Sequence, residues 1–451
     1  MTAAADSKAA TPNELARNFR TGSLLLFALP SMAMMLCLTL YTLADGFFIA
    51  RFVGDLALSA LNMFNPMWGL MMALGVMLGG GGSAMVGQLL GRRRVEQACR
   101  ILTALVLLCA VLGLVIGICC RFWRAELVML LGASPAQAPH CEAYLGILML
   151  FAPAFLLQLL FQTFFVTAGK PLLGFIVSVL AGLVNSGLDY LFMGPLHMGL
   201  AGAALATGCG GVVCAVSGCV FFCFRNKELH FARPQLGLLR LLNICYNGAS
   251  EMVSNLAMAL SCYLYNIAFL QLAGEAGVAA LVLVYYFEFV FTAVYFGYAQ
   301  GVSPVISYKY GAKDHAQLRL VVRRSVLIMV CASVVAFASS LGAADSVLHL
   351  FVPRGERVFQ LAQAGYPLYA LSFLFVGLGI LSSAVFTALS NGFVSALISA
   401  ARLLVLLPAC ILILPQFFGL PGLWSAISVA EFLGMLLGMG MVVALRKRYG
   451  Y

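Results

Sequence analysis

Charge is what this chain has least of. Only 9% of its 451 residues are Asp, Glu, Lys or Arg, against about 25% in an ordinary soluble domain. Hydrophobic residues make up 63%, and the mean hydropathy is +1.02. So many apolar side chains cannot all be hidden in the cores of soluble domains, which excludes a water-soluble fold. At about 20 residues per span plus short connections, the length has room for about twelve transmembrane helices.

The motifs of several other protein classes are also missing. The 14 cysteines are scattered through apolar runs, without a CxxC motif or a Cys/His cluster at metal-ligand spacing, so we interpret them as packing residues and expect no structural metal. No HExxH or GxSxG motif is present, so we expect neither an enzyme nor a cofactor. Gly79 to Gly82 lack the Lys-Ser/Thr of a phosphate loop, and we interpret them as a flexible helix end. A polar start with Lys8, Arg17 and Arg20 predicts no cleavable signal peptide.

Charge-free runs predict an all-α integral membrane protein with twelve transmembrane helices in two bundles. The spans are expected near residues 22–47, 57–84, 101–120, 143–168, 171–193, 199–224, 241–271, 278–308, 325–344, 364–389, 393–414 and 420–445. The longest polar connection, 225–240, divides them into six and six. We therefore predict an N-terminal segment (1–20), an N-lobe (21–224), an inter-lobe linker (225–240), a C-lobe (241–445) and a basic C-terminal segment (446–451).

The basic residues predict the orientation of the chain. Of the 26 Lys and Arg residues, 20 fall on the side of the two termini, five on the opposite side, and Arg402 lies inside a span. By the positive-inside rule, both termini are cytoplasmic, and the expected location is a bacterial cytoplasmic membrane. Basic loops at a membrane surface also account for the net charge of +10 without nucleic acid.

The two halves of the chain align with one another at a single constant shift. Small residues at span ends recur in register, with Gly54, Gly81, Ser83, Gly91 and Gly199 meeting Gly274, Gly301, Ser303, Gly311 and Gly419. Because each half has an even number of spans, the two repeats enter the membrane from the same side and are related by an axis along the membrane normal. Two such bundles facing one another across a cleft are the architecture of alternating access.

Carboxylates inside the spans are candidates for function, because an ionised group in hydrocarbon costs at least a few kcal/mol. There are five: Asp45, Asp189, Glu251, Glu288 and Glu431. Asn185 precedes Asp189 by four residues, which places both on one helix face. An amide and a carboxylate suit a hard cation, and the carboxylate could instead carry a proton. The alternative is structural, with Asp189 capping a loop and Asp45 ending its helix.

The C-lobe has a different polar set. Glu251 lies one turn from Asn247 and from Asn255, and Glu288 shares a face with Tyr285 and Thr292. Arg402 needs a partner in the membrane, and Glu431 is the candidate for a structural ion pair. Aromatic and methionine side chains usually only pack, but in a cleft they suit bulky apolar cations. The residues we predict to line a substrate cleft are Glu251, Glu288, Asn255, Tyr285, Tyr295 and Met67.

The sequence resembles the multidrug and toxin extrusion (MATE) transporters over residues 20 to 445, and most closely their MepA-like bacterial branch. The resemblance rests on the order and spacing of short pieces: Leu29-Pro30, Ala44-Asp45, the Gly-Gly-Ser and Gly91 of span 2, Asn185 with Asp189, Gly199-x-x-Gly202 with Ala206-Thr207, Ser303-Pro304-Val-Ile-Ser307 and Tyr310-Gly311-Ala312-Lys313.

This resemblance implies export of organic cations and other xenobiotics in exchange for protons or sodium ions. It places an N-lobe ion site on Asp45, Asn185, Asp189 and Thr207, with Tyr144 as an additional match. Glu251 matches an acid of span 7 in some branches. The tenth span, 364–389, lacks the carboxylate that some members carry, so no C-lobe ion site is implied, and Glu288 and Arg402 receive no role.

We therefore expect a cation-coupled exporter of drug-like small molecules, monomeric in the bilayer, with no nucleic-acid partner and no cofactor besides the transported H⁺ or Na⁺. The alternative within the same superfamily is a flippase for lipid-linked saccharides, for which a phosphate-bearing cargo would need a wide cationic cleft. A membrane enzyme or receptor is disfavoured, since there is no catalytic motif and no extramembrane domain.

Overall fold

The structure, a computed structural model, describes residues 13–53, 64–130, 138–226, 228–235 and 237–451. These residues are helical almost throughout and contain no β-strand. The prediction of an all-α membrane protein is therefore confirmed.

The N-lobe is formed by six spans. They are α1 (Thr21–Phe52), α3 (Asn65–Gly91), α4 (Val95–Phe122), α6 (Ala138–Leu148) continued by η2 (Met149–Phe151) and α7 (Ala152–Thr167), α8 (Pro171–Met193), and α9 (Gly199–Val220) with the π-helical turn η3 (Phe221–Arg225). A short helix, α5 (Arg124–Leu130), follows α4. The predicted start of the second span near residue 57 lies outside the described residues.

The C-lobe is built from longer segments. They are α10 (Leu238–Gly311), α11 (His315–Phe351), α12 (Arg357–Ala370), α13 (Phe373–Ala388), α14 (Gly392–Ala400), the π-helical turn η4 (Ala401–Leu406) and α15 (Leu407–Tyr449). Gly274 in α10 and Gly419 in α15 have φ of 68° and 60°, a region open to glycine, and each turns the chain back within a single residue. Each of these two segments therefore supplies two spans.

The number of spans follows from these breaks. Nine segments of the described chain are long and apolar enough to cross a membrane, and the pair α12 and α13, bent by 47°, makes a tenth. The glycine breaks divide α10 and the segment from α14 to α15, which gives twelve spans, in agreement with the sequence.

One prediction about the second span is wrong. Gly79 to Gly82 are not a helix end, because α3 continues through them to Gly91. A Cβ on Gly81 would lie 2.1 Å from the Ile244 carbonyl oxygen, and a Cβ on Gly248 would lie 2.0 Å from that of Met77. The glycines thus allow α3 and α10 to cross almost backbone to backbone, a packing role that helix propensity does not reveal.

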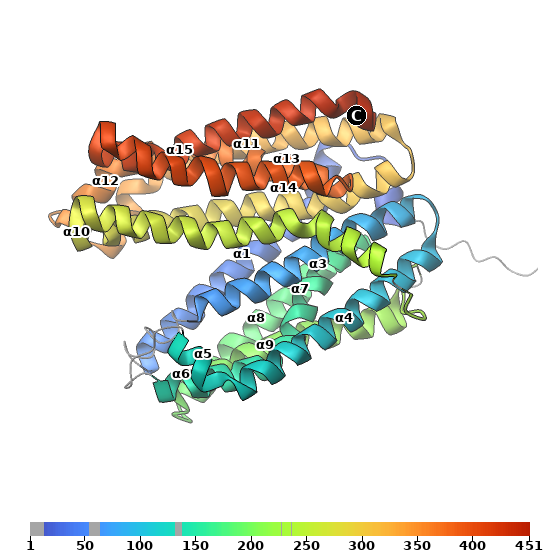
Figure 1. Cartoon of the computed structure of the whole chain (residues 1–451), viewed down its shortest axis with the longest axis horizontal. Coiled ribbons are helices and arrows are strands. Elements are labelled where there is room, and N and C mark those ends of the chain that lie inside the picture. Colours follow the sequence, from blue (N-terminus) through green and yellow to red (C-terminus); the bar gives the residue numbers. More distant parts are fainter. Residues whose placement is uncertain (1–12, 54–63, 131–137, 227, 236) are drawn as a thin grey trace, which may run out of the picture.

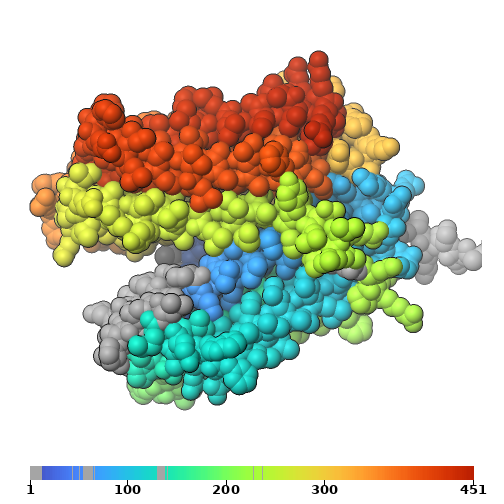
Figure 2. All heavy atoms as spheres, in the orientation of Figure 1, coloured from blue at the N-terminus to red at the C-terminus, as the bar shows by residue number. Residues whose placement is uncertain are grey.

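The two lobes touch at one end and diverge towards the other. In Figure 1 they converge near the C-terminus and separate towards α5 and α6, and the space-filling view shows a hollow between them on that side (Figure 2). At the closed end, Gln88 of α3 donates from Nε2 to the Ala388 carbonyl oxygen at 3.0 Å and to Ser390 Oγ at 2.9 Å. The molecule is therefore closed at the end that carries residues 13–20 and the C-terminus.

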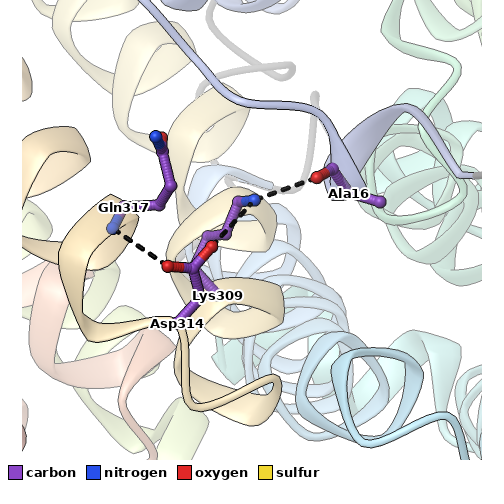
Figure 3. Close-up of polar contacts among 4 residues, drawn as sticks. All are labelled: Ala16, Lys309, Asp314 and Gln317. Atoms are coloured by element: carbon purple, nitrogen blue, oxygen red, sulfur yellow. Dashed lines mark hydrogen bonds and ion pairs between the residues drawn. The ribbon is translucent and has the colours of Figure 1, made fainter.

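The N-terminal segment, residues 13–20, ties the lobes together at this closed end. Glu14 pairs with Lys170 of the N-lobe at 2.7 Å. On the C-lobe, the buried Lys309 donates from Nζ to the Ala16 carbonyl oxygen at 3.0 Å and lies 3.5 Å from Asp314 Oδ2 (Figure 3). The backbone N–H of Gln317 donates to the other oxygen of Asp314, which holds this carboxylate in place.

The C-terminal residues 446–451, predicted as a basic segment, follow directly on the last span of the C-lobe. Helix α15 continues to Tyr449, and Gly450 (φ 79°) ends it. The Tyr449 hydroxyl accepts a hydrogen bond from Asn391 Nδ2 at 2.7 Å, and the Tyr451 hydroxyl donates to the Val442 carbonyl oxygen at 3.1 Å. Both tyrosines are buried, so this end of the chain is part of the packed C-lobe.

Candidate functional site

A polar cluster lies inside the N-lobe, where α1, α8 and α9 meet. Asp45 comes from α1, Asn185 and Asp189 from α8, and Thr207 from α9. Asn185 Nδ2 donates to Asp45 Oδ1 at 3.2 Å, and Thr207 Oγ1 donates to Asp45 Oδ2 at 3.2 Å. Both oxygens of Asp45 are thus held by neutral donors from two other helices.

The second carboxylate of the cluster, Asp189, is held differently. Its side chain is 0% exposed and faces the Asp45 carboxyl, yet neither of its oxygens has a hydrogen-bond partner among the described residues. The Asn185 Oδ1 atom, on the same face of α8, is unpartnered in the same way. Three acceptors without a donor in this part of the chain, beside a second carboxylate, form a site that a proton or a cation would complete.

Small residues and aromatic rings build the walls of this cluster. A Cβ on Gly210 would lie 3.1 Å from the Ala181 carbonyl oxygen and 3.2 Å from Asn185 Cβ, so the glycine brings α9 close to α8. A small cavity beside the cluster is lined by Tyr41, Trp68, Phe155, Gln158, Ala181, Asn185, Thr207, Gly210 and Gly211. Tyr144 is buried within electrostatic range of both carboxylates. The predicted N-lobe site residues therefore lie together.

The C-lobe contains an internal cavity of about 150 Å³. Its wall carries Glu288 and Glu431 together with Arg402, Asn255 and several tyrosines. The Tyr369 hydroxyl donates to Glu288 Oε2. Arg402 Nη1 lies 3.5 Å from Glu431 Oε2 and 3.4 Å from the Val376 carbonyl oxygen. Among the described residues of this lining, Arg402 is the one Lys or Arg side chain, so the wall is acidic overall.

The chain makes a specific place for Arg402. The residue lies in the π-helical turn η4, and such turns are frequent at functional sites. A Cβ on Gly379 would lie 2.5 Å from Arg402 Nη1, and a Cβ on Gly434 would lie 2.6 Å from its Cγ. The arginine side chain thus passes between two glycines. Its Nε has no acceptor among the described residues.

Glu251 lies between the lobes. It lines a cavity of about 40 Å³ with Gly80 and Thr163 from the N-lobe and with Gln300 and Thr387 from the C-lobe. A Cβ on Gly80 would lie 3.5 Å from Glu251 Cγ. This carboxylate is thus placed where the two lobes meet.

The other predicted cleft residues are placed differently from one another. Asn255 and Tyr285 line the C-lobe cavity with Glu288. Tyr295 is buried in the C-lobe core, where its hydroxyl donates to the Phe373 carbonyl oxygen at 2.9 Å. Met67 packs against the N-lobe core. Neither Tyr295 nor Met67 lines the C-lobe cavity, the cavity at Glu251 or the cavity beside the N-lobe cluster.

The internal repeat relates the two polar sites, although it carries no carboxylate of the N-lobe cluster onto a carboxylate of the C-lobe. The shift that aligns Gly54 with Gly274 also carries Asp45 onto Tyr265 and Thr207 onto Ile427, both of which line the C-lobe cavity. It carries Trp68 onto Glu288 and Gly211 onto Glu431 as well. Corresponding regions of the two lobes thus both contain carboxylates, but the carboxylates do not occupy equivalent positions of the repeat. Applying the shift to every buried acid could have found the second site.

The described chain has two similar bundles with a hollow between them, and its buried carboxylates have no catalytic partners. These features are those of a membrane transporter. The sequence model of the MatE family matches residues 30–191 and 252–412. The chain therefore belongs to this family of transporters. The two matches begin at residues 30 and 252, an offset close to that of the repeat seen in the sequence. The chain is a multi-pass membrane protein and not an enzyme.

Relatives and solved structures agree over nearly the whole chain. Multidrug export protein MepA of Staphylococcus haemolyticus is 25% identical over 431 residues, which is 94% of this chain and 93% of that protein. MepA of Staphylococcus saprophyticus is 22% identical over 427 residues, with the same coverage. A crystal structure of a MATE protein in the straight conformation has a TM-score of 0.90 at 23% identity, covering 97% of this chain and 99% of that one. An outward-facing multidrug resistance MATE family transporter has a TM-score of 0.89 at 22% identity, with the same coverage.

Proposed function

We propose that this protein exports amphipathic, drug-like organic cations across a bacterial cytoplasmic membrane, in exchange for H⁺ or Na⁺. The termini face the cytoplasm, as the 20 basic residues on that side favour. The described conformation, closed at the end of the termini, is then the outward-facing one. The MepA proteins to which the chain is similar are named as multidrug exporters, which supports this cargo and a contribution to antibiotic resistance.

The N-lobe cluster carries the proposal. Asp189 and Asp45 face each other inside the N-lobe, and the acceptor oxygens of Asp189 and Asn185 lack donors among the described residues. Two ionised carboxylates so placed repel each other, so binding of a proton or a sodium ion stabilises the pair. Each cation that moves inward supplies about 2.3 kcal/mol per 100 mV of membrane potential. That energy can drive a substrate outward if binding and release of the ion are tied to the movement of the lobes.

The acidic wall of the C-lobe cavity supports a cationic cargo. The lining carries Glu288 and Glu431, and Arg402 is the one basic side chain described in it. A further carboxylate, Glu251, lies where the two lobes meet. Tyrosine rings in the same wall offer π-faces to a cation. A phosphate-bearing saccharide lipid would meet carboxylates here, so the flippase alternative is less favoured.

Ethidium efflux from everted membrane vesicles tests the proposal. Asp189→Asn keeps the shape of the side chain and removes its charge, and we expect it to abolish uphill transport while leaving downhill exchange measurable. The matched control is Glu126→Gln, an exposed carboxylate of α5, which should transport like the wild type. Collapsing the pH and sodium gradients separately identifies the coupling ion. Uphill transport by Asp189→Asn at the wild-type rate would show that the cluster is not the coupling site.

A further inference from the structure

A groove outside the transport pathway runs between the first turns of α11 and the last turns of α15. Its volume is about 640 Å³, and its lining consists of Arg319, Val322, Arg323, Val326, Val442, Val443, Arg446, Lys447, Gly450 and Tyr451. Helices α11 and α15 both pack on α13, and the C-terminal end of α15 lies beside α11 in Figure 1. The groove therefore opens on the outer surface of the C-lobe, where lipid surrounds the protein.

The charges in this groove have no counter-ions in the described part of the protein. Arg319 and Arg323 are exposed and one helical turn apart, where like charges repel. Arg446 and Lys447 add two more cations from α15. Of the ion pairs in the described chain, none involves any of these four residues. A bound anion would relieve this repulsion.

The apolar part of the lining lies deeper in the membrane than the charges of α15. Val442 and Val443 are one turn further from the end of α15 than Arg446 and Lys447. Across the groove on α11, Val326 lies three residues deeper than Arg323, whereas Val322 lies between Arg319 and Arg323. The cations lie at the level of the lipid headgroups, and the valines extend to the level of the acyl chains. This arrangement fits an amphipathic anion, whereas a free phosphate ion would make no contact that needs the valines.

The N-lobe supplies an internal comparison. The shift between the two repeats carries Arg319 and Arg323 back onto Cys99 and Thr103. There the linker fills the groove, since Thr103 Oγ1 accepts from the Ala232 N–H at 3.0 Å and Cys99 Sγ accepts from the His230 N–H at 3.4 Å. No described segment fills the C-lobe groove in this way. The two C-lobe positions that correspond to Cys99 and Thr103 are the arginines Arg319 and Arg323.

We propose that this C-lobe groove binds the headgroup of an anionic phospholipid, with the phosphate between the arginines of α11 and α15 and one acyl chain along the valines. The ordered end of α15 supplies a fixed wall, because Tyr449 and Tyr451 are hydrogen-bonded to α15 and to the turn before α14. The site is separate from the carboxylate clusters, so it can be tested independently of the transported cargo.

The test measures lipid binding to the full-length protein by native mass spectrometry. The probes are phosphatidylglycerol and phosphatidylcholine with identical acyl chains. The variant is the triple change Arg319→Gln, Arg323→Gln and Arg446→Gln. We expect its affinity for phosphatidylglycerol to fall by about fivefold for each arginine removed, with phosphatidylcholine binding unchanged.

The control removes three exposed arginines from the same membrane face outside the groove, Arg92→Gln, Arg233→Gln and Arg240→Gln. An equal loss in this control would assign the binding to diffuse surface charge and overturn the proposal. Displacement of phosphatidylglycerol by inorganic phosphate at equal concentration would overturn it in favour of a free-anion site. If the triple variant does not fold, the phosphatidylglycerol affinities of Arg323→Gln and Arg323→Lys are compared instead. Only Arg323→Gln should bind more weakly, because Arg323→Lys keeps the charge.

Discussion

The crossing of α3 and α10 holds the closed end together, and a single methyl group there should open it. In Gly81→Ala the new Cβ would lie 2.1 Å from the Ile244 carbonyl oxygen and 3.1 Å from its carbon. Since a carbon rests at about 3.5 Å or more from such atoms, the two helices must separate by roughly 1 Å. Overpacking of this kind costs about 1–3 kcal/mol. The cost applies to the closed state and is relieved when the lobes part at this end.

That energy corresponds to a shift of about 5- to 150-fold in the ratio of the two states. The shift can be measured by electron–electron double resonance between spin labels at Glu96 and Ala316, exposed residues in the first turns of α4 and α11. The variant should populate longer distances than the wild type. Transport should slow as well, because one of the two states becomes rare.

The neighbouring glycine provides the control. A Cβ on Gly80 would meet only the flexible Glu251 side chain, at 3.5 Å, and alanine is the better helix former by roughly 0.5–1 kcal/mol. Gly80→Ala should therefore leave the distance distribution unchanged. An unchanged distribution in a folded Gly81→Ala protein would refute the reasoning that this crossing sets the closed end.

Three further predictions concern the C-lobe and the N-terminal segment. Arg402→Ala leaves Glu431 buried and unpaired, so thermal unfolding in nanodiscs should report a loss of about 3–5 kcal/mol in the free energy of unfolding. The double change of Arg402 and Glu431 to leucine should recover most of this loss. Equal losses in the two variants would contradict the pairing. Tyr369→Phe removes the donor to Glu288 and should weaken binding of an organic cation severalfold in a fluorescence titration if that bond orients the carboxylate; unchanged affinity would assign the tyrosine to packing. Lys309→Met removes the contact with the N-terminal segment and should increase proteolytic cleavage of that segment in the folded protein, while an unchanged cleavage rate would show that the other contacts suffice.

Most of the fold could be predicted from the sequence, because lipid demands long apolar helices whatever they pack against. The two turns at Gly274 and Gly419 were predicted only as gaps of several residues between spans. They are single residues in the structure, since glycine alone reverses the chain so tightly at low cost. The error at Gly79 to Gly82 has the opposite cause. Helix propensity treats glycine as a helix breaker, but here the glycines lie within a continuous helix and allow α10 to approach α3 closely.

The polar sites were predictable to different degrees. The spacing of Asn185 and Asp189 places both on one helix face, and both are buried there in the structure. The partnership of Glu288 with Tyr369, 81 residues apart, depends on the rotation of α10 and α12 about their axes. No local pattern encodes that rotation, and the same holds for the passage of Arg402 between Gly379 and Gly434.

The two lobes differ most in how they balance charge. In the N-lobe cluster, Asp45 and Asp189 face each other with neutral donors described on Asp45 only, and no basic side chain of the described residues pairs with either carboxylate. At the corresponding place in the C-lobe, Arg402 supplies a positive charge to Glu431, and a tyrosine hydroxyl binds Glu288. A resident arginine cannot leave with the transport cycle, whereas a proton or a sodium ion can. On the function proposed above, the exchangeable cation therefore belongs to the N-lobe cluster and the permanent one to the C-lobe, so we expect ion coupling in the N-lobe and a cationic substrate at Glu288.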